Sequence, residues 1–151
     1  PYEIFEHPKR EKTIAFINRH KYFHYEIYDR NFDLIEMQGQ IWNFAEKYGL
    51  KSKYAQMLQL CCEESIYTMM SGCYDEDDHI SIVVDITYTE SDGTLQLNLI
   101  CAGKEFNPFD LEDTDENFET NISVNILKKR SKNFSHKYEN GLNKIKLDLK
   151  L

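Results

Sequence analysis

The feature that most constrains the fold is a period of two in the second half of the chain. Apolar residues alternate with polar ones along 80–88 and 95–101, on either side of the turn Glu90–Gly93. Alternation puts every second side chain on one face of a strand, and an Asp-Gly pair suits the turn of a hairpin. The same pattern returns in 134–151 around the pair Asn140-Gly141. The sequence therefore predicts two hairpins, with one face of the sheet buried.

The first half of the chain predicts one strand and two helices. Aromatic and polar residues alternate through 22–28, as in a strand. Apolar residues then recur at near-helical spacing over 32–48, and Gly49 is the expected C-cap. A second helix is predicted to take Ser52 as its N-cap and to stop at Ser71-Gly72.

A polar stretch over 103–118 and a third helix over about 120–130 separate the two hairpins. The predicted order is strand, helix, helix, hairpin, long loop, helix, hairpin. This order is typical of a two-layer α/β sandwich with a mixed or antiparallel sheet and helices on one face. With 41% hydrophobic and 13% aromatic residues, the composition is that of a folded chain. No apolar run approaches the ~20 residues that a membrane-spanning helix needs, so direct membrane insertion is not expected.

Charge is distributed unevenly within a net charge of −8. Lys104 is the only Lys or Arg among many acidic residues from Tyr74 to Glu119, whereas 120–151 is rich in lysine. An acidic middle argues against a nucleic-acid surface, which would need clustered cations. It also suggests how a homodimer could form, with the acidic part of one copy against the basic end of another.

The cysteines and acidic clusters do not predict a metal site. The spacing of the four cysteines includes no Cys-x-x-Cys pair; they are Cys61, Cys62, Cys73 and Cys101. They are expected to be small buried thiols in a reducing cytosol. The run Asp75–Asp78 lacks the alternating spacing and the glycine of a calcium loop. It is expected to be a solvated loop.

The first twenty residues have no initiator Met and resemble the end of the ATPase subunit of polar-amino-acid ABC transporters. In that family a segment Ile-Phe-x-x-Pro-x-x-Glu-Lys/Arg-Thr-x-x-Phe closes the nucleotide-binding domain. The residues that fit it are Ile4, Phe5, Pro8, Glu11, Lys12, Thr13 and Phe16. The resemblance implies that 1–20 are the tail of an upstream ATPase domain or a linker helix, and that 21–151 form an accessory domain. It also implies permease subunits as partners and a cytoplasmic position at the inner face of the membrane. ATP and Mg²⁺ would then be bound by the full-length protein rather than by this part.

A second resemblance covers about 23–151. The order of elements is similar to the ATP-binding fold shared by histidine kinases, gyrase B and anti-sigma-factor serine kinases, and most similar to the last group. Cys61–Thr68 lies on the helix that carries a Glu-Glu motif in that group. Ile100–Phe109 follows the expected strand with a Gly-x-x-Phe-Asn-Pro segment.

The resemblance implies a nucleotide site made of Glu64, Thr68, Cys101, Gly103 and Asn107. In the family, a Glu activates the attacking group and an Asn four residues later binds Mg²⁺, but Glu64 is here followed by Thr68, a poorer ligand. Cys101 replaces an Asp that accepts a hydrogen bond from adenine, a bond a thiol accepts poorly.

Gly103 is kept, whereas the glycine-rich lid over the phosphates is replaced by the acidic segment 113–119. Each acidic side chain close to a triphosphate would repel it by ~1 kcal/mol or more. Together with Thr68 and Cys101, this segment indicates a degenerate site without ATPase activity.

The leading hypothesis is therefore a C-terminal accessory or regulatory domain of an ABC-transporter ATPase that binds no cofactor of its own. One alternative is an active serine kinase or ATPase of the anti-sigma-factor type that uses Glu64. Another is a small-molecule sensor that binds a different ligand in the same cleft.

Overall fold

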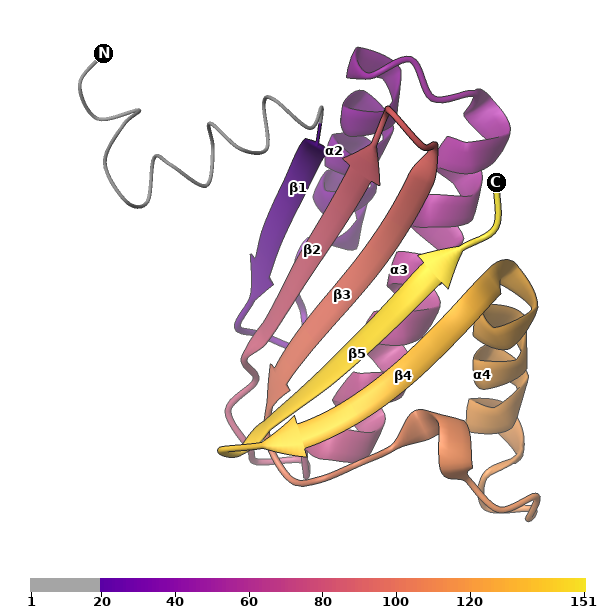
Figure 1. Ribbon diagram of the computed structural model, residues 1–151. Helices are drawn as coiled ribbons and strands as arrows, with labels where there is room; N and C mark the ends of the chain where they lie inside the picture. The colour runs from indigo at the N-terminus through magenta and orange to yellow at the C-terminus, as the bar shows by residue number, and fades with distance from the viewer. Residues whose placement is uncertain (1–19) are drawn as a thin grey trace.

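The computed structural model describes residues 20–151 and contains one five-stranded sheet with helices on one of its faces (Figure 1). The chain runs through β1 (His20–Ile27), α2 (Leu34–Lys47), α3 (Ser52–Cys73), β2 (Ile82–Thr89), β3 (Thr94–Ala102), the short 3₁₀ helix η2 (Pro108–Asp110), α4 (Phe118–Arg130), β4 (Ser131–Glu139) and β5 (Leu142–Leu149). This is the predicted two-layer α/β sandwich. The resemblance of residues 1–20 to a transporter ATPase falls almost wholly on residues 1–19, which lie outside the described range.

The sheet has the strand order β1-β2-β3-β5-β4, and all four neighbouring pairs are antiparallel. The sequence left open whether the sheet was mixed or antiparallel, and the structure decides for antiparallel. The last hairpin turns at Asn140 and Gly141, whose φ angles of 54° and 76° are those that an Asn-Gly hairpin turn requires.

The alternating residues of both hairpins form the core. Every second residue of β2, β3 and β5 is buried beneath the helices, as the period of two predicts. Ile86 and Leu97 have no exposed surface at all. Each large apolar side chain buried in this way contributes roughly 1.5–3 kcal/mol, so the three central strands supply a large part of the core on the sheet side.

The helix boundaries follow from caps, with one correction to the sequence prediction. In α2, the Asp33 side chain accepts from the backbone N–H of Glu36 at 2.9 Å, and Gly49 ends the helix with a φ of 73°. The prediction that Ser52 is the N-cap of α3 is wrong, because Ser52 is the first residue of the helix. The N-cap is Lys51, which has an extended backbone and makes no side-chain capping hydrogen bond.

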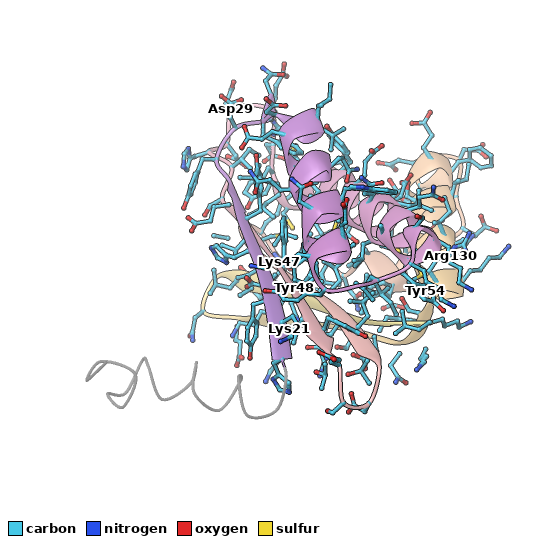
Figure 2. All side chains as sticks on the ribbon, turned by 90° about the horizontal axis from the view of Figure 1, so that it is seen from above. Lys21, Asp29, Lys47, Tyr48, Tyr54 and Arg130 are labelled. Carbon is cyan, nitrogen blue, oxygen red and sulfur yellow. The ribbon has the colours of Figure 1, made fainter. Side chains whose placement is uncertain are left out.

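The three helices lie side by side with α3 in the middle (Figure 1). The side chains of Gln38 and Gln59 donate reciprocally to each other's backbone carbonyl oxygens, at 3.1 and 2.9 Å, and join α2 to α3. At the opposite end of α2, the ammonium groups of Lys21 and Lys47 each lie 5.3 Å from the centre of the Tyr48 ring (Figure 2). This cation–π contact joins the edge strand β1 to α2.

Candidate functional site

The predicted nucleotide-site residues come from α3, from the end of β3 and from the loop that follows. Helix α3 presents Glu64 and Thr68 one turn apart, as the sequence indicates. Their surroundings differ, because Glu64 is partly exposed and Thr68 is 5% exposed. The position that would hold Mg²⁺ in the resembled family is thus packed against the core.

Cys101 lies at the end of β3 with no exposed surface. Its thiol is hydrogen-bonded to that of Cys73, the last residue of α3. This bond, together with burial, raises the pKa of Cys101, while the same bond holds the pKa of Cys73 below its ordinary value against the effect of burial. The position that would read adenine is therefore a buried thiol whose hydrogen bond stays within the protein.

All four cysteines are free and buried, as predicted. The contact between Cys73 and Cys101 could not be read from their spacing, because it depends on where α3 ends against the sheet.

Gly103 is required by close packing against the end of α3. A Cβ at this position would lie 2.8 Å from the backbone oxygen of Cys73 and 3.1 Å from the Tyr74 ring. The backbone N–H of Lys104 donates to the same Cys73 oxygen at 3.2 Å. The missing side chain of Gly103 therefore allows a close approach of the backbone to the protein's own helix.

Asn143 organises the loop after β3 and was missed by the sequence interpretation. Its Oδ1 accepts from the backbone N–H of Phe106 at 3.0 Å and from Nε2 of His136 at 2.8 Å. Its Nδ2 donates to the backbone oxygen of Lys104 at 2.8 Å and contacts Sγ of Cys73 at 3.4 Å. Its side chain is fully buried. The sequence does contain a sign of this role, because Asn143 is the one polar residue at the alternating positions of β5 that are buried. A buried polar side chain needs hydrogen-bond partners.

Phe106 lies where the loop meets α3. A Cβ on Gly72, one turn from the predicted Mg²⁺ position, would collide with the Phe106 ring. The absence of a side chain at Gly72 thus makes room for an aromatic ring between the loop and α3, a role that the helical pattern of the sequence did not indicate.

Asn107 has a local structural role. It precedes η2, and its Oδ1 accepts from the backbone N–H of Phe109 at 3.0 Å. The Phe109 ring in turn packs on Phe134 of β4, with ring centres 4.7 Å apart, and Nζ of Lys128 donates to the Phe109 backbone oxygen at 3.3 Å. The Phe-Asn-Pro segment therefore pins the loop between α4 and the edge of the sheet.

The acidic segment 113–119 is an exposed loop that runs into α4. Helix α4 begins at Phe118, two residues earlier than predicted, so Glu119 belongs to its first turn. There a carboxylate is favoured by the positive end of the helix dipole. The amide groups of Asn117 and Asn121 both donate to the backbone oxygen of Glu112, at 3.0 and 3.1 Å, and hold the loop against the helix.

The structure brings some of these residues together and leaves others apart. Cys101 and Gly103 contact the C-terminal end of α3 at Cys73. Glu64 is nine residues earlier in that helix, about 14 Å along its axis. The predicted catalytic position therefore lies on α3 itself, whereas the predicted adenine-reading position on β3 lies against the far end of that helix.

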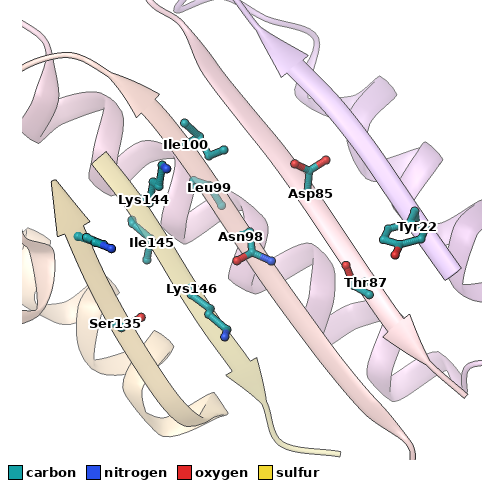
Figure 3. A pocket seen from close by; sticks show the side chains of 11 residues that line it. Tyr22, Asp85, Thr87, Asn98, Leu99, Ile100, Ser135, Lys144, Ile145 and Lys146 are labelled. Carbon is teal, nitrogen blue, oxygen red and sulfur yellow. The ribbon is translucent and has the colours of Figure 1, made fainter. Parts of the chain in front are cut away.

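A hollow of about 600 Å³ lies on the face of the sheet away from the helices. Lys144 and Lys146 of β5 line it on one side and Asp85 of β2 on the other, with Asn98 of β3 between them (Figure 3). It is separated by the sheet from Cys101, whose side chain points to the helical layer.

The acidic run Asp75–Asp78 is tied to its neighbours. Oδ1 of Asp75 accepts from Nζ of Lys104 at 2.7 Å, and Oδ2 of Asp78 accepts from the backbone N–H of Asp75 at 2.7 Å. Within residues 20–151, no three His, Cys, Asp or Glu side chains gather as a metal site would require. No helix in this part of the chain has the length and apolar character needed to cross a membrane.

Comparison with known proteins identifies the fold and no more. No family model matches the chain, and no curated protein matches it. Among solved structures, the chain is similar to one chain of the SiaB-SiaC complex from Pseudomonas aeruginosa, with a TM-score of 0.66 and 12% sequence identity. The match covers 93% of this chain and 95% of that chain. Identity this low establishes a shared architecture only, and nothing in the match supports the transporter resemblance of residues 1–20.

Proposed function

We propose that this chain is a regulatory domain that acts by binding a partner protein, on a fold resembling that of anti-sigma-factor kinases. The observation that carries the proposal is the burial of Cys101. At the position where the resembled kinases read adenine, the side chain is a free thiol with no exposed surface. A buried thiol offers adenine no strong acceptor.

Two further contacts support the loss of nucleotide chemistry. Thr68 is packed into the core at the Mg²⁺ position, and the Phe106 ring fills the space above Gly72. The acidic loop before α4 adds repulsion toward phosphates. The similar chain belongs to a complex of two proteins, which supports a protein partner for this one.

Calorimetric titration of the chain with Mg-ATP and Mg-ADP tests the proposal. We expect no heat of binding up to about millimolar nucleotide, and no thermal stabilisation, whereas a ligand at 100 times its Kd would add ~2.7 kcal/mol. The variant Glu64→Ala serves as the matched control and should behave like the unaltered chain. Nucleotide turnover that is lost in Glu64→Ala would contradict the proposal.

A working serine kinase or ATPase is the second candidate. It is favoured by Glu64, which stays partly exposed on α3, and by the retained Gly103. In this case Mg-ATP binds, and Glu64→Ala abolishes turnover without abolishing binding. The same titration thus separates the two functions.

The transporter context remains a separate prediction, because it depends on residues outside the described range. A phosphate loop and an ABC signature in the residues encoded before Pro1 would establish it. Upstream sequence without them would remove the transporter ATPase and permease subunits as partners and leave the regulatory proposal intact.

A further inference from the structure

Helix α4 carries a stripe of exposed apolar side chains. Phe118 is 62% exposed and Ile122 is 49% exposed, and Ile126 is partly exposed on the same face, each one turn from the next. Val124 and Leu127 on the opposite side are buried and already attach the helix to the core. Single exposed apolar residues are common, but an aligned row opposite a satisfied core face is typical of a contact surface.

The charges of α4 are separated along its axis. Acidic residues gather at its start, where Glu119 follows the acidic loop, and the last turn consists of Lys128, Lys129 and Arg130. Glu119, Lys129 and Arg130 are all exposed. The stripe is therefore flanked by negative charge at one end and positive charge at the other.

A hollow adjoins the basic end of the stripe. It has a volume of about 480 Å³, lies between α3 and α4, and is lined by Leu60, Ile126, Lys129 and Arg130. Figure 2 shows Arg130 at the outer edge of the molecule. The hollow has room for a large side chain, with apolar walls and cationic groups at its rim.

We propose that α4 is the interface between two copies of this chain, packed antiparallel about a twofold axis that crosses the exposed face of the helix at the level of Val124. In this arrangement Ile122 of each copy meets Ile126 of the other. Glu119 of each copy meets Lys129 of the other, and each Phe118 enters the hollow beside the other's Arg130. The contact is isologous, so every interaction occurs twice.

The symmetry of α4 about Val124 favours a second copy as the occupant of this surface. Glu119 and Lys129 each lie five residues from it, Ile122 and Ile126 each two, and Phe118 and Arg130 each six. When two such helices run antiparallel, these three pairs place acid with base, aliphatic with aliphatic, and aromatic ring with guanidinium. An unrelated partner would have to reproduce the same spacing, whereas a second copy supplies it by symmetry.

This inference does not depend on the proposed regulatory function. It is tested by sedimentation equilibrium of the full chain from about micromolar to about millimolar concentration, which spans the affinities of weak and standard interfaces. We expect a reversible monomer–dimer equilibrium. Ile122→Asp should abolish it, with unchanged circular dichroism because Ile122 is not part of the core.

The decisive experiment exchanges the charges of Glu119 and Lys129. Glu119→Lys alone and Lys129→Glu alone should each raise the dimer Kd roughly tenfold or more, because each places like charges at both symmetry-related contacts. Mixing the two variants in equal amounts, or combining both changes in one chain, should restore dimerisation.

Lys146→Glu is the matched control, since it makes the same charge change on the far side of the sheet and should leave the dimer unaffected. A chain that stays monomeric at about millimolar concentration would overturn the inference. The inference would also be overturned if Ile122→Asp left the dimer Kd unchanged, or if mixing the two charge-reversed variants did not restore dimerisation.

Discussion

The backbone N–H of Phe106 donates to Oδ1 of Asn143 over a sequence separation of 37 residues. This bond joins the loop after β3 to the last strand of the sheet, and the same amide side chain also holds the Lys104 carbonyl. With three further polar contacts, to His136, Cys73 and Cys101, this single buried side chain makes five where the predicted nucleotide site would be.

Asn143→Leu is expected to lower the free energy of unfolding by about 2–4 kcal/mol, because it removes the partner of the part-buried Phe106 N–H and Lys104 carbonyl and those of the other groups that Asn143 binds. Urea denaturation measures the change. Asn133→Leu on the exposed edge strand is the control and should stay within about 0.5 kcal/mol of the unaltered chain. Equal effects of the two substitutions would show that Asn143 does not anchor the loop.

Gly72→Ala should destabilise the domain even though alanine favours helices. An Ala in place of Gly normally gains about 0.5–1 kcal/mol in a helix interior. At Gly72 the new Cβ meets the Phe106 ring, and displacing a packed ring costs roughly 1–3 kcal/mol, so the clash dominates.

Two comparisons sharpen this prediction. Gly39→Ala in α2, where an added Cβ meets nothing within 4 Å, should be stabilising. In a chain that already carries Phe106→Ala, Gly72→Ala should become neutral or stabilising. Thermal unfolding of the unaltered chain, the two single variants and the double variant gives the coupling between Gly72 and Phe106, and a coupling near zero would contradict the contact.

Restoring the resembled family's acidic residue should harm this chain. Cys101→Asp is expected to cost about 3 kcal/mol or more, because it puts a carboxyl group beside Cys73 with no exposed surface. Cys101→Ser keeps a small hydrogen-bonding side chain and should cost roughly 1 kcal/mol. Mg-ATP should rescue neither variant in a thermal-shift measurement. Rescue of Cys101→Asp by ATP would instead reveal a working adenine pocket.

His24 makes stability depend on pH in a defined direction. Its two ring nitrogens contact Oε2 of Glu26 at 2.8 Å and Oδ1 of Asp85 at 2.6 Å, so both must carry a proton to donate. These two hydrogen bonds raise the pKa of His24 above its ordinary value of 6.5, and the bond to Glu26 has the larger effect. A raised pKa in the folded state means that the stabilisation is complete below the unfolded value and is lost as pH rises through the folded value.

The stabilisation should be small, because the His24 side chain is 53% exposed and solvent screens the pair. Titration by nuclear magnetic resonance should show an elevated His24 pKa that falls in Asp85→Asn. Asp148→Asn, on the same face of the sheet but hydrogen-bonded to Gln96 instead, should leave it unchanged. A His24 pKa at or below 6.5 would contradict the bridging arrangement.

The sequence predicted the elements well because their signals are local. The alternation of Ile82, Val84 and Ile86 alone defines a half-buried strand, and an Asn-Gly pair defines the last turn. The placement of Glu64 and Thr68 on one helix followed from the same kind of pattern. Such signals involve neighbours a few residues apart, so one sequence contains them in full.

Non-local relationships could not be predicted in this way. The contact of Phe106 with Gly72 depends on where the loop crosses α3, and the hydrogen bond of Cys101 with Cys73 depends on the end of that helix. In α4, apolar residues lie on both sides, with Val124 buried and Ile122 exposed, so periodicity could not tell the core face from the free one. Only the position of the helix on the sheet decides this.

The anchoring of the loop by Asn143 also sets an order of assembly. Because a chain is made from its N-terminus, the loop 103–110 cannot reach its final form until the last strand has been added. We expect the amides of 103–110 to lose protection from exchange with solvent in Asn143→Leu, while those of α2 and α3 keep theirs. Equal protection in the variant and in the unaltered chain would show that the loop closes without Asn143. Strand β5 thus fixes the loop after β3, and this step comes late in folding.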